Sequence, residues 1–327
     1  MKIAVLGAGA WGTALALSIS RKCEVSLYSS NAELARDIRK NKENLEYLPD
    51  VALPESVTVT NSLTDALDSS SFVVFAVPVK GLRQTLQACR LNAGDTKPYI
   101  ITCKGFEQGS GLLPFQVLEA VIADYPYAVL SGPSFARDVG LGKPVTVSLA
   151  TSNSKLFNEF SVILQHGDIR TYFNDDVLGV SLGGAVKNVI AIASGMAGGL
   201  GVGSSALAGL VTRGLSEMAR LGIRLGAKSE TFMGLSGIGD LFLTSFSDMS
   251  RNQRLGRQLA NGRNLEEAEI EIGQITEGVQ AAYEVLNLSK KLSVEMPITE
   301  AVVKVLSSEL TCEAAAASLF ARPNKKE

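Results

Sequence analysis

The N-terminus carries the feature that most constrains the fold. An apolar run at residues 2–6 is followed by the glycine-rich segment Gly7-Ala8-Gly9-Ala10-Trp11-Gly12, and then by a helix-compatible stretch. In a strand–turn–helix of this kind, Gly7, Gly9 and Gly12 let the backbone approach a pyrophosphate, which the free amides and dipole of the helix stabilise. The motif alone is weak evidence, and a glycine turn without a ligand is the alternative. Its place at the start of a βα repeat favours a dinucleotide site.

Further apolar runs follow, separated by segments that read as helices. The runs rich in β-formers are 24–29, 57–60, 72–77, 98–104, 127–132 and 144–150. This alternation predicts an α/β fold with a doubly wound parallel sheet. After one more strand-like run at 169–173 the β signals end, and the chain reads as helices with glycine-marked breaks. We therefore expect a dinucleotide-binding domain over 1–174 and an all-helical domain over 175–327, a length sufficient for two cores.

The end of the second predicted strand bears on the choice of cofactor. An NAD-selective site usually has Asp or Glu there, bound to the ribose 2′-hydroxyl. This chain has Tyr28-Ser29-Ser30-Asn31, without a carboxylate. Because nothing there repels a 2′-phosphate, we expect NADP to be accepted, and NAD as well. Arg36 and Arg39 lie further along and could assist.

One charged residue interrupts a long apolar stretch. Between residues 178 and 210, Lys187 is the sole charged side chain. Length alone would permit a membrane span, but repeated glycines and the absence of aromatic or basic flanks argue against one. A helix apolar on all sides is a buried helix. A buried lysine can have a lowered pKa and exchange protons, so we predict a proton-transfer role for Lys187. A purely structural role is the alternative.

Composition narrows the functional classes. A formal net charge of −2 gives no basic footprint for nucleic acid. The chain enters a strand directly, so we expect no signal peptide or membrane anchor and a cytoplasmic location. The four cysteines are scattered, and we expect them to be reduced and incidental. With His166 as the one histidine, a multi-histidine metal site is impossible and a Ser-His-Asp triad improbable, so we predict no metal.

Two loops that follow predicted strands are candidate ligand contacts, since ligands collect beyond the carboxyl ends of parallel strands. Lys104 ends one strand, and a solvated lysine is the alternative interpretation. In the other loop, Gly132-Pro133 enforces a turn that can present backbone amides and the Ser134 hydroxyl. An ordinary surface turn is the alternative there.

Two segments of the helical half are also candidates. A glycine-rich stretch at 231–241, expected to be a loop, delivers the carboxylate Asp240, which could orient Lys187 or cap a helix. Ser250-Arg251-Asn252 begins a further helix and could cradle a phosphate. An N-cap followed by a solvated arginine is the alternative for this triplet.

Taken together, these motifs resemble the soluble bacterial NAD(P)-dependent glycerol-3-phosphate dehydrogenases over the whole chain. The segments that carry the resemblance are GAGAWGTALA (7–16), LPDVALP (48–54), TCKGFE (102–107), SGPSFA (131–136), GGAVKNVIAIASG (183–195), TRGLSEMARLG (212–222), GLSGIGDL (234–241), SRN (250–252) and TEGV (276–279).

The resemblance implies a Rossmann-type domain followed by an all-α domain, with the active site between them. It implies hydride transfer with NAD(P)H that interconverts dihydroxyacetone phosphate and sn-glycerol 3-phosphate, Lys187 being the proton acceptor and donor. The implied substrate contacts are Lys104, Gly132, Ser134, Lys187, Asp240, Ser250, Arg251 and Asn252. The implied cofactor contacts are Trp11, Ser30, Lys104, Ala136, Arg251, Ile275 and Glu277, besides the three motif glycines.

The resemblance also implies a supply of glycerol 3-phosphate for glycerophospholipid synthesis, and the apolar helical half is compatible with a homodimer. The chain departs from the family at Ser181, where Glu is common, and at Ser205, where Asn or Asp is common. Ser30 stands where many relatives have Arg or His. Two other functions stay open at this point: a β-hydroxyacid dehydrogenase, and a non-catalytic dinucleotide sensor.

Overall fold

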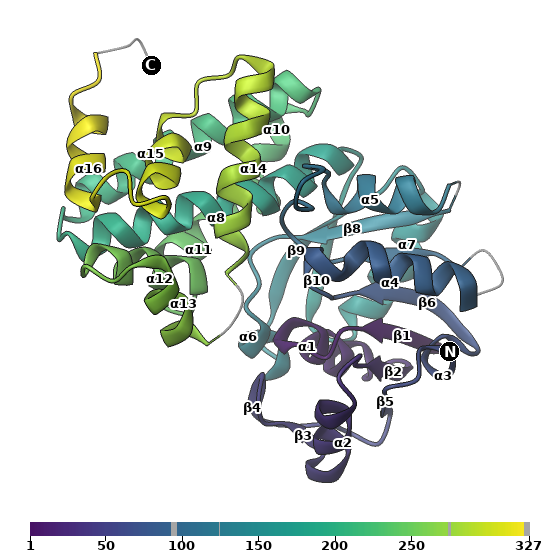
Figure 1. Cartoon of the computed structure of the whole chain (residues 1–327). Helices are drawn as coiled ribbons and strands as arrows, with labels where there is room; N and C mark the ends of the chain where they lie inside the picture. The colour runs from purple at the N-terminus through teal and green to yellow at the C-terminus, as the bar shows by residue number, and fades with distance from the viewer. Residues whose placement is uncertain (93–96, 124, 274–275, 324–327) are drawn as a thin grey trace. The chain divides into compact units, whose positions relative to one another are not determined.

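The computed structural model describes residues 1–92, 97–123, 125–273 and 276–323, which form two compact units. Unit 1 comprises residues 1–107 and 112–181, and unit 2 comprises 108–111 and 182–327. The division falls inside helix α8 (Val177–Gly199), whereas the boundary predicted near residue 174 coincides with the end of the last strand. Figure 1 shows the helices and strands of each unit.

Unit 1 is built on an eight-stranded sheet with the order β10-β9-β8-β7-β6-β1-β2-β5. The strands are β1 (Lys2–Leu6), β2 (Glu24–Tyr28), β5 (Val57–Thr60), β6 (Ser70–Phe75), β7 (Tyr99–Ile101), β8 (Tyr127–Ser131), β9 (Val145–Ala150) and β10 (Ile169–Asn174). Each corresponds to a run predicted from the sequence. A short antiparallel pair, β3 (Glu43–Asn44) and β4 (Leu48–Ala52), was not predicted, because its polar sequence lacks a strand pattern.

Helices flank this sheet in two groups. They are α1 (Ala10–Ile19), α2 (Ala32–Asn41), α3 (Leu63–Leu67), α4 (Val79–Asn92), α5 (Pro114–Val121), α6 (Ala136–Gly140) and α7 (Ser154–Gln165). Helix α1 packs with α6 and α7, and α4 packs with α3 and α5 (Figure 1). Alternate side chains of β1 point to opposite faces of the sheet, and Ile3 and Val5 belong to the core beneath α1 and α7. All of Ile3–Leu6 is buried, so both faces of β1 are covered. Burial on both faces explains the continuous apolar runs.

One pairing departs from the predicted parallel sheet. Strands β8 and β9 are antiparallel, with Ser131 opposite Ser148, while the other pairs of this sheet are parallel. A parallel crossover needs a connection that returns the chain along the whole strand, usually a full helix. The connection here contains only the five-residue helix α6, so β9 starts beside the end of β8. The sheet is therefore mixed at this point.

Unit 2 consists of helices that surround the C-terminal part of α8. They are α9 (Ser204–Leu225), α10 (Ser229–Phe232), α11 (Asp240–Phe246), α12 (Arg251–Ala260), α13 (Leu265–Ile272), α14 (Glu277–Leu292), α15 (Pro297–Leu306) and α16 (Cys312–Phe320). By length and composition α8 is the one helix among the described residues that could cross a membrane, but 89% of its most apolar window is buried inside the protein. The apolar composition of α8 is therefore that of a helix in the core of the protein.

Glycines let other backbones approach α8 closely. A Cβ on Gly195 would lie 2.0 Å from the carbonyl oxygen of Gln253 on α12, and one on Gly256 would lie 2.0 Å from the carbonyl oxygen of Ile192. On the N-terminal side, a Cβ on Gly183 would lie 2.5 Å from the carbonyl oxygen of Ser236. Since no side chain fits at these crossings, the small residues of α8 set how near its neighbours can come.

Most of the stretch at 231–241 is helical, and the expectation of a loop was wrong. Helix α10 ends at Phe232, and after Met233 and Gly234 a π-helical turn, η1 (Leu235–Gly239), leads directly into α11. A Cβ on Gly237 would lie 2.1 Å from the carbonyl oxygen of Phe232, so glycine here permits tight winding rather than a loop. Such turns often occur at functional sites, and this one delivers Asp240 at its end.

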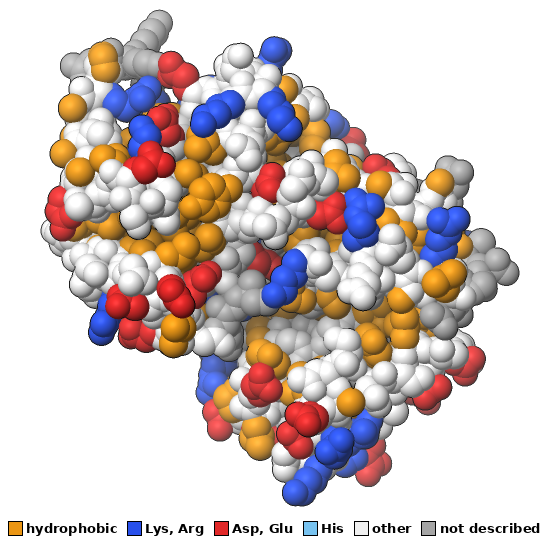
Figure 2. Space-filling model, in the orientation of Figure 1, with side chains coloured by type: hydrophobic (Ala, Val, Ile, Leu, Met, Phe, Trp, Pro, Cys, Tyr) orange, Lys and Arg blue, Asp and Glu red, His pale blue; other side chains and the backbone are white. Residues whose placement is uncertain are grey.

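Charges of the two signs are interspersed on the surface. On the face drawn in Figure 2, Lys and Arg side chains alternate with Asp and Glu side chains over both units. The formal net charge is −2, and the absence of a nucleic-acid partner stays a prediction.

Candidate active site

The glycine-rich turn between β1 and α1 has the form that a dinucleotide requires. Gly7 has a φ of +112°, and a Cβ there would lie 2.7 Å from the carbonyl oxygen of Ala76. A Cβ on Gly12 would lie 1.8 Å from the carbonyl oxygen of Gly7, so α1 packs against the turn itself. Beside Gly9, by contrast, no atom of the described residues, apart from the adjoining backbone, lies within 4 Å of the Cβ position. This open space at the first turn of α1, where helical amides lack intrahelical acceptors, fits a pyrophosphate.

The end of β2 is neutral, as its sequence indicates. Ser30 is exposed, and the buried Ser29 accepts a hydrogen bond from the amide of Asn31 at 3.2 Å. Asn31 caps α2 by accepting from the amides of Glu33 and Leu34. Its side chain is thus committed to the helix, and Ser30 is the exposed hydroxyl at the place where a 2′-phosphate would lie.

Two predicted cofactor contacts lie at α1, one within it and one on a helix that packs against it. Trp11 lies in its first turn, partly buried against the core of unit 1. Ala136 begins α6, which packs on α1. Arg39, which could have assisted at a 2′-phosphate, donates to the carbonyl of Val59 at 3.2 Å, whereas Arg36 is exposed.

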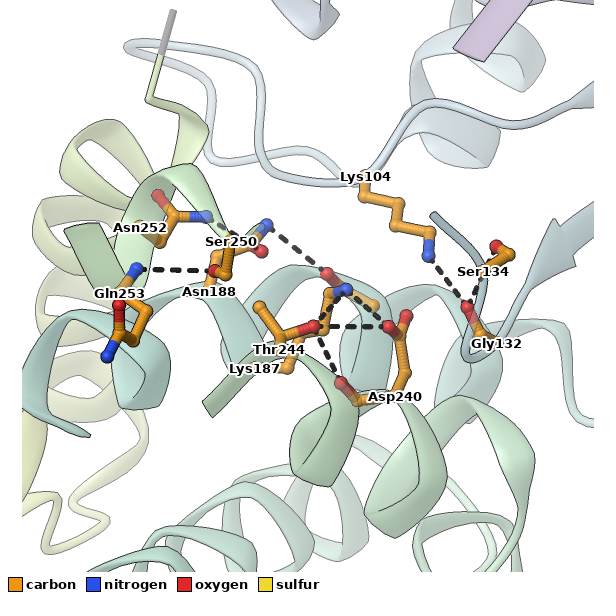
Figure 3. Close-up of polar contacts among 11 residues, drawn as sticks. Lys104, Gly132, Ser134, Lys187, Asn188, Asp240, Thr244, Ser250, Asn252 and Gln253 are labelled. Carbon is orange, nitrogen blue, oxygen red and sulfur yellow. Dashed lines mark hydrogen bonds and ion pairs between the residues drawn. The ribbon is translucent and has the colours of Figure 1, made fainter. Parts of the chain in front are cut away.

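Lys104, Gly132 and Ser134 converge on one carbonyl. Lys104 donates from Nζ to the carbonyl oxygen of Gly132 at 3.2 Å, and the hydroxyl of Ser134 donates to the same oxygen at 3.2 Å (Figure 3). Gly132 has a φ of +150°, and a Cβ there would lie 2.9 Å from Cα of Val147 on the neighbouring strand. Lys104 is half-buried rather than fully solvated. The three predicted residues therefore form one polar group in unit 1.

Lys187 is buried in unit 2 and has partners. It is 7% exposed, and its Nζ forms an ion pair with Oδ1 of Asp240, which is 1% exposed. Nζ also donates to Oγ1 of Thr244 at 2.8 Å (Figure 3). The Thr244 hydroxyl in turn donates to the Asp240 carbonyl at 2.7 Å. An unpaired buried charge would be strongly disfavoured, so the carboxylate and hydroxyl are what allow an ammonium here.

Sequence reasoning missed Thr244. Its signal was available, because Thr244 lies four residues after Asp240 and residues i and i+4 share one face of a helix. Without knowing that α11 starts at Asp240, however, the spacing carries no information.

In the Ser250-Arg251-Asn252 triplet, the serine and the asparagine make structural hydrogen bonds, and the arginine is exposed. Ser250 caps α12 by accepting from the amide of Gln253 at 3.2 Å, which is the alternative weighed for this serine. Asn252 is buried, donates to Oδ1 of Asn188 at 3.0 Å and accepts from the amide of Gly278 at 3.1 Å. Asn252 therefore joins α8, α12 and α14, and it lies beside the residue that follows Lys187. Arg251 is exposed at the N-terminus of α12.

The remaining predicted cofactor contacts lie at the start of α14. Glu277 is its first residue and half-buried. Ile275 lies outside the described residues. The two departures from the family differ in setting: Ser181 is 6% exposed on α8, whereas Ser205 is exposed in the first turn of α9.

Among the described residues no group of three or more His, Cys, Asp or Glu side chains could hold a metal ion. The four cysteines are buried, and none of them forms a disulfide among the described residues. Burial raises the pKa of Cys89 to about 12 and that of Cys312 to about 11, so both thiols stay protonated and weakly nucleophilic.

Comparison with known proteins identifies the family. The family described as "NAD-dependent glycerol-3-phosphate dehydrogenase N-terminus" matches residues 2–157, and the one described as the C-terminus of the same enzyme matches residues 176–317. The chain belongs to the NAD-dependent glycerol-3-phosphate dehydrogenase family. It is thus an oxidoreductase that uses a nicotinamide cofactor.

Individual members of the glycerol-3-phosphate dehydrogenase family match over the full length. The chain is 47% identical to glycerol-3-phosphate dehydrogenase [NAD(P)+] of Dechloromonas aromatica, with 100% of this chain and 99% of the relative covered. It is 45% identical to the enzyme of the same name from Nitrosomonas europaea, with 98% of each covered. A crystal structure of glycerol-3-phosphate dehydrogenase from Coxiella burnetii superposes with a TM-score of 0.95 at 37% identity, covering 98% and 99% of the two chains.

Proposed function

We propose that this dehydrogenase interconverts dihydroxyacetone phosphate and sn-glycerol 3-phosphate, with Lys187 as its acid–base group. The observation that carries the proposal is the buried Lys187 ammonium, held by Asp240 and Thr244, in a chain that also has an open glycine turn for a dinucleotide. When bound, the nicotinamide supplies the hydride to the substrate carbonyl carbon or takes it back. The residues Gly7, Gly9 and Gly12, with the first turn of α1, would hold its pyrophosphate.

In the reductive direction, negative charge develops on the carbonyl oxygen. The Lys187 ammonium stabilises that charge through a hydrogen bond and delivers its proton to the oxygen, becoming a neutral amine. In the oxidative direction the neutral amine takes the proton from the hydroxyl. A positioned acid–base group of this kind contributes about 10²–10⁴-fold to the rate.

Asp240 and Thr244 keep this lysine ready for the task. Both oxygens accept from Nζ, so they hold the ammonium in a fixed orientation. Because Asp240 is 1% exposed, its charge acts on the ammonium with little screening by water.

The remaining polar residues are proposed to bind the substrate and cofactor. Lys104 would release the Gly132 carbonyl and bind both ligands, while Ser134 contacts the substrate. Arg251 offers an exposed guanidinium at a helix N-terminus, a setting suited to a phosphate. Ser250 and Asn252 hold the first turn of α12 in place around it.

The test is the Lys187→Ala variant, with Lys80→Ala, at an exposed lysine of α4, as the matched control. We expect kcat to fall about 10²–10⁴-fold while the affinity for NADPH is unchanged. A shifted melting temperature with an unchanged rate would mean that Lys187 is only structural. Cofactor binding without turnover of any small carbonyl by the unaltered protein would point to a sensor.

A second assay addresses the substrate. NADPH consumption with dihydroxyacetone phosphate, and none with a semialdehyde acid, is the expected result. The reverse would identify a β-hydroxyacid dehydrogenase. The charge of Arg251, placed for a phosphate, favours the phosphorylated three-carbon substrate.

Further expectations extend the proposal. The neutral end of β2 supports acceptance of NADP as well as NAD, which parallel assays with NADPH and NADH would measure. We also propose a cytoplasmic homodimer that supplies glycerol 3-phosphate for glycerophospholipid synthesis, without a nucleic-acid or membrane partner. Light scattering would measure the subunit number, and loss of growth that added glycerol 3-phosphate restores would test the supply.

A further inference from the structure

A buried asparagine outside every predicted motif holds the glycine-rich turn. Asn44, in strand β3, has no solvent exposure. Its Nδ2 donates to the carbonyl oxygen of Ala8 at 2.9 Å and to Oγ1 of Thr13 at 2.8 Å. Its Oδ1 accepts from the amide of Tyr47 at 3.2 Å. The side chain thus uses both ends, one on the β3–β4 turn and the other on the glycine-rich turn.

The bond to Ala8 determines where an amide points. The Ala8 carbonyl and the Gly9 N–H belong to one planar peptide unit, and no cis peptide occurs among the described residues. In a trans unit these two groups point in opposite directions. Because Asn44 draws the Ala8 carbonyl toward the interior, the Gly9 N–H is turned away from Asn44. Gly9 is also the motif glycine whose Cβ position is open.

We propose that Asn44 is a positioning residue for the cofactor: it fixes the Ala8–Gly9 peptide so that the Gly9 amide can donate to the pyrophosphate. The inference rests on the proposed placement of the pyrophosphate at the Gly7–Gly12 turn. Peptide orientation matters here because a reversed unit would present a carbonyl oxygen to an anion, and an acceptor facing a phosphate repels it.

The surroundings of Asn44 require a donor at Nδ2. Ala8 is 4% exposed and Thr13 is fully buried, so water does not replace the bond to the Ala8 carbonyl. Aspartate has the same shape but places an acceptor opposite that carbonyl. Two facing buried acceptors repel, which favours rotation of the peptide.

The experiment compares Asn44→Asp with Asn153→Asp. Asn153 caps α7 only as an acceptor, from the amide of Leu156 at 3.0 Å, so Asp preserves its bond. Cofactor affinity is read directly from quenching of Trp11, the only tryptophan of the chain, which lies in the turn itself. We expect Asn44→Asp to weaken NADH binding about tenfold or more, with kcat at saturating cofactor within about twofold of the unaltered enzyme. Asn153→Asp should leave both values unchanged.

Two more variants keep the outcomes distinct. Thr13→Val removes one of the two acceptors of Asn44 at nearly constant volume, and it should weaken NADH binding about two- to threefold. If Asn44→Asp does not fold, this variant decides the question. Gly9→Val fills the open space and should abolish binding. Normal binding by Gly9→Val would refute the proposed pyrophosphate site itself. Loss of binding in Gly9→Val with normal affinity in the other two variants would refute only the role of Asn44.

Discussion

Gly183 on α8 lies in backbone contact with Ser236 of the π-helical turn, one helical turn before Lys187. The Cβ that Gly183 lacks would lie 2.5 Å from the Ser236 carbonyl oxygen. The same π-helical turn leads into α11 and Asp240. The absence of one methyl group therefore lets the carboxylate reach the lysine.

Gly183→Ala tests this dependence. The added methyl should push the π-helical turn away from α8 and lengthen the contact between Lys187 and Asp240. We expect kcat to fall at least tenfold and stability to fall by about 1–3 kcal/mol, as for overpacking in a core. Steady-state rates and denaturant unfolding measure the two effects.

Gly198→Ala, in the same helix, is the matched control. Within the part of the chain that the structure describes, no atom outside the backbone of α8 and the adjacent residues lies within 4 Å of its Cβ position, and the residue is exposed. Alanine there should stabilise α8 by up to about 1 kcal/mol without changing the rate. Equal losses in both variants would mean that helix content, rather than the Ser236 contact, is what matters.

Thr244→Val should lower kcat about tenfold, because it removes a hydroxyl that accepts from the buried Lys187 ammonium at 2.8 Å. Cofactor affinity should not change. Thr244→Ser retains the hydroxyl and should restore most of the rate. A serine variant as slow as the valine variant would show that the methyl contact, and not the hydrogen bond, is needed.

Ser30→Asp should discriminate between the two cofactors. Ser30 is exposed at the end of β2, so a carboxylate there would face a 2′-phosphate. We expect KM for NADPH to rise roughly tenfold or more, with little change for NADH. Ser152→Asp, at another exposed serine of unit 1, should change neither value. Equal effects on NADPH and NADH would place the 2′-position elsewhere.

Stability should depend on pH through Glu217. This residue of α9 is 2% exposed and accepts from the amides of Ile298 and Thr299 at the start of α15, at 2.7 and 3.3 Å. Burial raises its pKa from 4.5 to about 7, against the opposing effect of those amides and of Arg220.

Because the folded protein binds this proton more tightly than the unfolded chain, the stabilisation is fully present below pH 4.5. It is lost as the pH rises through about 7, by roughly 3 kcal/mol at most. Glu217→Gln should remove this part of the slope in urea unfolding measured between pH 5 and 8. Identical slopes in the two proteins would contradict the assignment.

Local patterns were sufficient for much of unit 1. A strand, a glycine turn and a helix in succession are specified by neighbouring residues, so the turn at Gly7–Gly12 and the succession of strands along the chain followed from the sequence. The reversal at β9 did not, because it depends on how far the short helix α6 can carry the chain. The apolar stretch around Lys187 likewise predicted a buried helix with a charge to be compensated.

What compensates that charge was decided by the tertiary structure. Asp240 and Thr244 are 53 and 57 residues from Lys187 along the chain, and Asn44 is 36 residues from Ala8. No local periodicity links residues so far apart; their contacts depend on which helices can pack closely, and glycines such as Gly183 control that approach. The sequence by itself thus determined the dinucleotide turn and a lysine that needed partners. Which side chains Lys187 and the glycine-rich turn contact was decided only by the packing of α8 against α11 and of β3 against that turn. A hydrogen bond needs its two atoms within about 3 Å of each other, and residues far apart in the sequence come that close only in the folded chain.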